Sequence, residues 1–110
     1  MKVYDLHDTQ NRLWAFEISN LGVGRRGVCR VVEAIPGAML KRKPKFLSWF
    51  REDAFCEFLV DGELYVAEEP WGDNSRYWIG PNPPRWLPQT EKVRAAFSTY
   101  KPSLLRALGV

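Results

Sequence analysis

Histidine is almost absent from this sequence, and cysteine is scarce. Of the 110 residues, one is histidine and two are cysteine. A single histidine, His7, excludes a two-histidine metal site and histidine-dependent triads, leaving only a Cys–His couple open. Cys29 and Cys56 are far apart and form no CxxC pair, so we expect neither a zinc site nor a disulfide and interpret both as small buried hydrophobic residues. We therefore predict no metal and no cofactor.

Long apolar runs are also missing. No stretch approaches the roughly 18 to 20 apolar residues that span a bilayer. The opening MKVYDLHD lacks the basic-then-apolar order of a signal peptide. These absences predict a cytoplasmic protein without a membrane partner. No nucleophile elbow, P-loop or EF-hand motif occurs, so no residue is assigned a catalytic role.

The sequence does contain enough apolar residues to form one hydrophobic core. Hydrophobic residues make up 45% and aromatic residues 14% of the chain, which is typical of a folded domain. A length of 110 residues fits a single domain, taken here as 1–110. The net charge is +3, with basic residues concentrated in the first half and acidic residues in the second.

Hydrophobic alternation predicts a mostly antiparallel sheet. The Asp61-Gly62 pair between two alternating runs is typical of a type I′ hairpin turn. Two strands, a helix, a strand, this hairpin, a last strand and a C-terminal helix follow in order, which indicates an α+β fold with the two helices on one face of the sheet. The predicted strands are 2–7, 12–19, 38–42, 54–60, 63–68 and 76–80, with Trp14, Phe16 and Ile18 on one face of the second; segment 45–50 fits helix or strand.

Two apolar stripes at helical spacing predict the helices. The first is ended by Pro36-Gly37, and the second starts at Thr90 as its N-cap. Pro102 is expected to kink or split the second helix. The stripes consist of Val28, Val31, Val32 and Ile35, and of Val93, Phe97, Tyr100, Leu104 and Leu108.

The first helix is preceded by a glycine-rich segment, Gly22–Gly27, that matches GxGxxG. Against a dinucleotide site, the preceding strand is already paired in a hairpin, only one βαβ unit is possible, and no acidic residue lies at the tip of the next strand. Glycines that shape a turn and allow close helix packing are the favoured interpretation. A weaker alternative is a phosphate or carboxylate held by the helix start with Arg25 and Arg26.

The basic run Lys41–Lys45 is followed by Phe46, Trp49 and Phe50. Cations neutralise phosphates and aromatic faces stack on unpaired bases, so nucleic-acid binding is the second hypothesis. A solvated loop beside core aromatics is the ordinary alternative. The candidate anion-binding residues are Arg25, Arg26, Lys41 and Lys43.

The segment 68–78 has the most distinctive composition in the chain. It holds two tryptophans, a tyrosine, an arginine and three carboxylates, and Trp, Tyr and Arg are the residue types that dominate protein-binding hot spots. In the ordinary alternative, the loop residues form turns and Arg76 neutralises Glu68 or Glu69 across the strands. The candidate partner-binding residues are Trp71, Asp73, Asn74, Arg76 and Tyr77.

The helix ending in Ile35-Pro36-Gly37, the Asp61-Gly62 hairpin and the loop 70–73 (PWGD) together resemble small bacterial immunity proteins of polymorphic toxin systems. The resemblance covers residues 21–81 in general build. It implies a protein that covers a toxin's active site and has no catalytic residues. Such families usually present an acidic surface to nuclease toxins, so the positive net charge argues against a nuclease partner.

The leading hypothesis is therefore a non-catalytic protein-binding module that neutralises a toxin by forming a stoichiometric complex. Nucleic-acid or phosphate binding through 25–45 is the alternative. The third hypothesis is a small enzyme that uses Glu68, Asp73 or His7. Exposed tryptophans on a small domain also leave a homodimer open.

Overall fold

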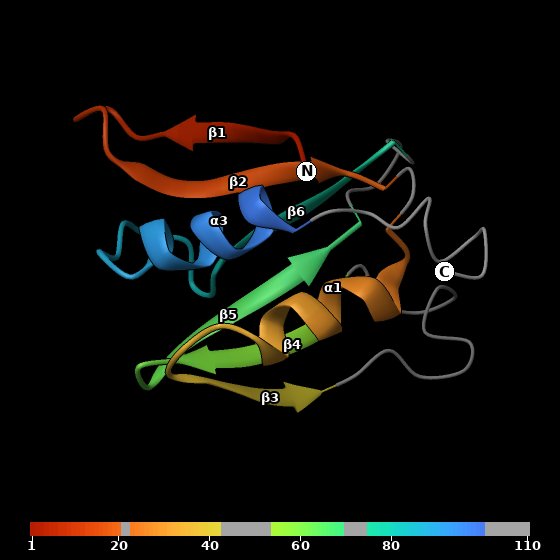
Figure 1. Ribbon diagram of the computed structural model, residues 1–110. Coiled ribbons are helices and arrows are strands. Elements are labelled where there is room, and N and C mark those ends of the chain that lie inside the picture. The colour runs from red at the N-terminus through yellow and green to blue at the C-terminus, as the bar shows by residue number, and fades with distance from the viewer. Residues whose placement is uncertain (21–22, 43–53, 70–74, 101–110) are drawn as a thin grey trace.

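The described part of the chain forms one antiparallel sheet with two helices on the same side (Figure 1). The structure is a computed structural model that describes residues 1–20, 23–42, 54–69 and 75–100. Within these residues the strand order is β1-β2-β6-β5-β4-β3, with every neighbouring pair antiparallel. The expected α+β class is confirmed. The elements are β1 (Val3–His7), β2 (Leu13–Ser19), α1 (Arg25–Glu33), β3 (Ala38–Arg42), β4 (Ala54–Val60), β5 (Glu63–Glu68), β6 (Arg76–Pro81) and α3 (Thr90–Thr99).

Short turns of the expected chemistry join the sequential hairpins. Asp61 and Gly62 have φ angles of 51° and 83°, and two positive φ angles define the type I′ turn predicted between β4 and β5. At the β1–β2 turn, the Asp8 carboxylate accepts hydrogen bonds from the backbone N–H groups of Gln10 and Arg12, both at 2.9 Å. An aspartate that bonds its own backbone in this way fixes a tight connection.

Both helices pack their apolar stripes onto the sheet. In α1, Val28, Val31 and Val32 are buried, as predicted. In α3, Val93 and Phe97 are buried. The centre of the Phe97 ring lies 5.6 Å from the centre of the Phe16 ring on β2. The N-cap prediction for α3 is wrong by one residue: Gln89 occupies the cap and Thr90 is the first helical residue. The Thr90 hydroxyl lies 2.7 Å from the Tyr65 hydroxyl in the core, so it is not available for capping.

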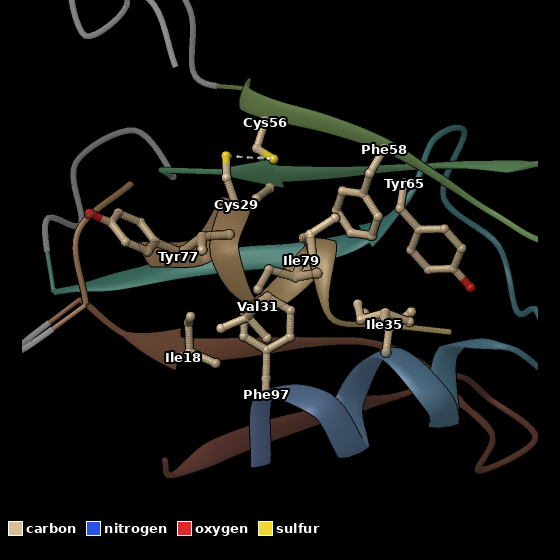
Figure 2. Close-up of a cluster of buried hydrophobic side chains, with 14 of the residues drawn as sticks. Ile18, Cys29, Val31, Ile35, Cys56, Phe58, Tyr65, Tyr77, Ile79 and Phe97 are labelled. Atoms are coloured by element: carbon tan, nitrogen blue, oxygen red, sulfur yellow. Dashed lines mark hydrogen bonds between the residues drawn. The ribbon is translucent and has the colours of Figure 1, made fainter. Parts of the chain in front are cut away.

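The main core lies between the helices and the sheet (Figure 2). Phe16, Ile18, Phe58, Tyr65 and Ile79 are fully buried on the strands. Trp14 does not join them, although strand alternation predicts that it should. Trp14 is half-buried and its ring lies 5.8 Å from that of Trp78. The register between β1 and β2 shifts next to this position, between Leu6 and His7, and such an irregularity re-aims a side chain.

Several expectations concern residues that the structure does not describe. The ambiguous segment 45–50, the Pro102 kink, and the continuation of the second stripe to Leu104 and Leu108 lie outside the described residues. Among the residues that are described, no helix is long and apolar enough to cross a membrane.

Candidate partner-binding face

The sheet has a second face, on which neither α1 nor α3 lies. Its residues follow from the strand register: Tyr4 pairs with Glu17, Glu17 with Trp78, and Trp78 with Glu68, which places these side chains in one row across four strands. Arg76 is two residues before Trp78 and therefore shares its face. We call Tyr4, Trp14, Glu17, Arg76 and Trp78 the aromatic face.

A glycine allows the Trp78 indole to lie against the sheet. A Cβ atom at Gly80 would come within 2.7 Å of Trp78 Cη2 and 2.9 Å of Ala15 Cβ. The indole thus covers Gly80, next to Ala15, while Trp78 itself stays half-buried. Val66 pairs with Gly80 from the other side. Ala15 and Val66 are 0% and 2% exposed but do not belong to the main core cluster, so this face has a small apolar layer of its own.

Arg76 is the charged centre of the aromatic face. Its guanidinium donates a hydrogen bond to the Glu17 carboxylate at 3.2 Å and lies 3.6 Å from the centre of the Tyr4 ring. Its side chain is still 37% exposed. The acidic partner is therefore Glu17 on β2, not Glu68 or Glu69 as the alternative interpretation expected. Glu69 instead forms an ion pair with Arg25 at 2.9 Å.

The other candidate partner-binding residues have different positions. Tyr77 is 6% exposed and belongs to the main core (Figure 2), where its ring meets Phe55 edge-on at 4.9 Å. Burial also raises the pKa of its hydroxyl above the ordinary value. Alternation explains this position, since Arg76 and Tyr77 are adjacent on β6 and point to opposite faces. Tyr77 therefore offers no contact surface, and Trp71, Asp73 and Asn74 lie outside the described residues.

The three candidate anion-binding residues whose positions are described do not form one cluster. Arg25 is held by Glu69 and lies 4.9 Å from the centre of the Phe55 ring, with its side chain 18% exposed. Arg26 is exposed on α1, Lys41 is exposed on the edge strand β3, and Lys43 is outside the described residues. Gly24 is the N-cap of α1, and a Cβ at Gly27 would lie 3.1 Å from Val23. That close approach supports the packing interpretation for Gly27 but not for Gly24, where a Cβ would meet no atom within 4 Å.

A groove that sequence reasoning missed runs between the two helices. It encloses about 560 Å³ and is lined by small apolar residues such as Ala34, Ala95 and Ala96 between Arg30 and Lys92. Lys92 already forms an ion pair with Asp61 at 2.9 Å. The only sequence signal was the run of small residues on α3, and such runs are equally typical of close helix packing.

The two groups proposed for catalysis whose positions are described, His7 and Glu68, are not brought together. His7 lies at the end of the edge strand β1, while Glu68 is level with Tyr4 and three strands away. Asp73 is outside the described residues. Among the residues with described positions, no three His, Cys, Asp or Glu side chains are grouped in a way that could hold a metal ion.

No protein-family model, curated protein or solved structure matches this chain. The case for a function therefore rests on the described residues themselves.

Proposed function

We propose that this chain is a non-catalytic protein-binding module whose partner contacts the aromatic face. The observation that carries the proposal is the packing of Trp14, Trp78, Tyr4 and a partly exposed Arg76 on a sheet face that neither helix covers. Tryptophan, tyrosine and arginine supply most of the energy in protein interfaces, because their large rigid groups bury area at little entropic cost. A sheet also holds them in fixed positions before binding.

The charge on this face favours a protein partner over a nucleic acid. Arg76 is neutralised by Glu17, and the same row carries Glu68, so phosphates would meet carboxylates beside the aromatic rings. Lys2 lies 5.1 Å from the centre of the Tyr4 ring and only balances the charge of the second carboxylate, and the candidate cation Arg26 is on α1, behind the opposite face of the sheet. Nucleic-acid binding requires an excess of cations beside stacking rings on one surface. The centres of protein interfaces, in contrast, are depleted in net charge and enriched in aromatic residues and arginine.

The resemblance to immunity proteins suggests the class of partner. Proteins of that kind neutralise a toxin by covering its active site, which requires a rigid recognition surface and no chemistry of their own. A toxin domain is accordingly our proposed partner. Because the aromatic face carries no net excess of acidic groups around Arg76, a toxin with an apolar binding surface fits better than a strongly basic nuclease.

The proposal can be tested by affinity capture with the full chain as bait. The immobilised protein should retain one protein in near-equimolar amount from a lysate of its source organism. We expect Arg76→Ala and Trp14→Ala to lose most of this retention, and each to weaken the affinity measured with the purified partner by about thirty-fold, as is typical of a hot-spot residue.

Arg26→Ala is the matched control, since it removes an exposed arginine from the helix side. It should retain the partner as the wild type does, with all three variants showing similar unfolding temperatures. If the two face variants bind as tightly as the wild type, the aromatic face is not the contact surface. Retention of RNA or DNA instead of a protein would contradict the function itself. Sedimentation of the purified chain would reveal whether the retained partner is a second copy.

A further inference from the structure

The strongest unexplained feature of the core is the contact between its two cysteines. The Sγ atoms of Cys29 and Cys56 are 3.1 Å apart (Figure 2). Cys29 is on α1 and Cys56 on β4, and the two are separated by 27 positions in the sequence. Both side chains are buried, as expected, but nothing in their spacing indicated that they would meet.

Local backbone geometry directs Cys56 toward the helix. Strand alternation places Cys56 on the same core-facing side of β4 as Phe58, which is fully buried. The β4–β5 register shift between Ala54 and Cys56 accounts instead for the burial of the neighbouring Phe55. On the helix, Cys29 is buried beside Val28. Two well-fixed elements thus hold the thiols face to face.

We propose that this pair is a modification site at which the folded chain closes an intramolecular disulfide under oxidising conditions. The S–S bond of a disulfide is about 2.05 Å long, so the sulfur atoms must approach by only about 1 Å from their present separation. Small rotations of the two side chains can supply this movement without displacing α1 from β4.

The reaction balances with glutathione disulfide as the oxidant. The Cys29 thiolate attacks one sulfur of glutathione disulfide, the S–S bond breaks, and one glutathione thiolate leaves. The Cys56 thiolate then attacks the Cys29 sulfur and releases the second glutathione. The two cysteines are oxidised, the oxidant is reduced to two glutathione thiols, and these take up the two protons. Cys29 is the entry point because it is 5% exposed, whereas Cys56 is 0% exposed.

The environment makes closure slow at neutral pH. The hydrogen bond with Cys29 and the burial of the site raise the pKa of the Cys56 thiol well above its ordinary value. Because the thiolate is the attacking form, the rate should increase with pH and with local opening around Cys29. We therefore expect the two cysteines to become oxidised during sustained oxidising conditions and not during a brief exposure to oxidant.

The test equilibrates the full chain in glutathione buffers of increasing oxidised fraction. One series starts from the reduced folded protein and the other from protein refolded in the same buffers. In both series we expect the intact mass of the protein to fall by the mass of two hydrogens. Trypsin should release a linked pair of peptides, residues 27–30 and 52–76. The oxidised protein should unfold about 10 °C higher than the reduced one, since the crosslink closes a long loop.

Cys56→Ser, which keeps Cys29, is the matched control and should show neither the linked peptides nor the thermal shift. Two alkylatable thiols in both series, or only glutathione adducts and intermolecular dimers, would overturn the proposal. A disulfide that forms only in the protein refolded in these buffers, and not in the reduced folded protein, would also contradict closure in the folded chain. Linkage from both starts supports it, whatever the result of the partner-binding experiments.

Discussion

Gly80 shows how one residue can determine the shape of a surface. The Trp78 indole can lie against the sheet only because position 80 has no side chain. Alanine ordinarily stabilises a strand relative to glycine by roughly 0.5 to 1 kcal/mol. Here the added Cβ would contact both the indole and Ala15 at under 3 Å. Because the Ala15 Cβ is fixed to the backbone of the neighbouring strand, the contact cannot be relieved by side-chain rotation alone.

We therefore expect Gly80→Ala to lower the free energy of unfolding by about 1 to 3 kcal/mol, the usual cost of overpacking. Denaturant unfolding of the purified variant measures this directly. The same substitution in a Trp78→Leu background should cost less, because the indole is gone and only the Ala15 contact remains. Equal costs in the two backgrounds would contradict the indole's contribution and assign the whole cost to the Ala15 contact.

At the scale of elements, α1 begins without a side-chain cap. Gly24 is the N-cap, with φ and ψ of −80° and 177°, and no acidic residue occurs in the first turn. The first backbone N–H groups of a helix have no partner within the helix and carry partial positive charge. An aspartate side chain at the cap could accept one of these hydrogen bonds, and a Cβ at position 24 would meet no atom within 4 Å.

Gly24→Asp should therefore stabilise the chain by about 0.5 to 1 kcal/mol, from capping and from the favourable interaction with the helix dipole. The gain is measurable by thermal unfolding and should shrink in high salt, which screens the electrostatic part. Gly24→Ala is the control, since it adds a side chain that cannot cap. An aspartate variant no more stable than the alanine variant would contradict the prediction.

The elements were predictable from sequence wherever one local signal determined them. The Asp61-Gly62 turn and the alternation on either side of it predicted the β4–β5 hairpin, and the valine stripe predicted α1. The Trp14 side chain was misplaced because alternation assumes a regular strand, whereas the register here shifts at Leu6 and His7. A bulge depends on the partner strand, and a single strand's own pattern does not reveal it.

The candidate site was predictable only in part for a similar reason. Arg76 was identified from composition alone, but its partner Glu17 is 59 positions away in sequence, and only the β2–β6 pairing brings the two together. The composition of segment 68–78 predicts Tyr77 on the same surface as Arg76. In a strand, neighbours point to opposite faces, and it is the packing of the helices that decides which face becomes the core.

For the whole molecule, the sheet separates two environments with different roles. On the helix side, closely packed apolar groups include buried polar atoms that are mutually satisfied, such as the hydroxyls of Tyr65 and Thr90. On the other face of the sheet, the indoles of Trp14 and Trp78 and the ion pair of Arg76 with Glu17 lie on a partly solvent-exposed surface. Under the proposed function, stability and recognition depend largely on different residues, so we expect substitutions on the aromatic face to change binding without unfolding the chain.

The buried phenols make the stability of the whole molecule sensitive to alkaline pH. Burial raises the pKa of both Tyr65 and Tyr77, and the hydrogen bond to Thr90 offsets part of the effect for Tyr65. In the unfolded chain these groups ionise near pH 10. Above that pH the unfolded chain loses protons that the folded chain keeps, so unfolding becomes more favourable.

We expect the free energy of unfolding to fall as pH rises above about 10, with each buried phenol contributing up to about 1.4 kcal/mol per pH unit. Denaturant unfolding between pH 8 and pH 11 measures the slope. Tyr77→Phe removes one ionisable group while keeping the ring in the core, so its slope should be shallower than that of the wild type. Lysines and other groups titrate equally in both proteins, and the difference between the slopes therefore isolates Tyr77. Parallel curves would mean that Tyr77 ionises in the folded chain as readily as in the unfolded one, which its position in the core argues against.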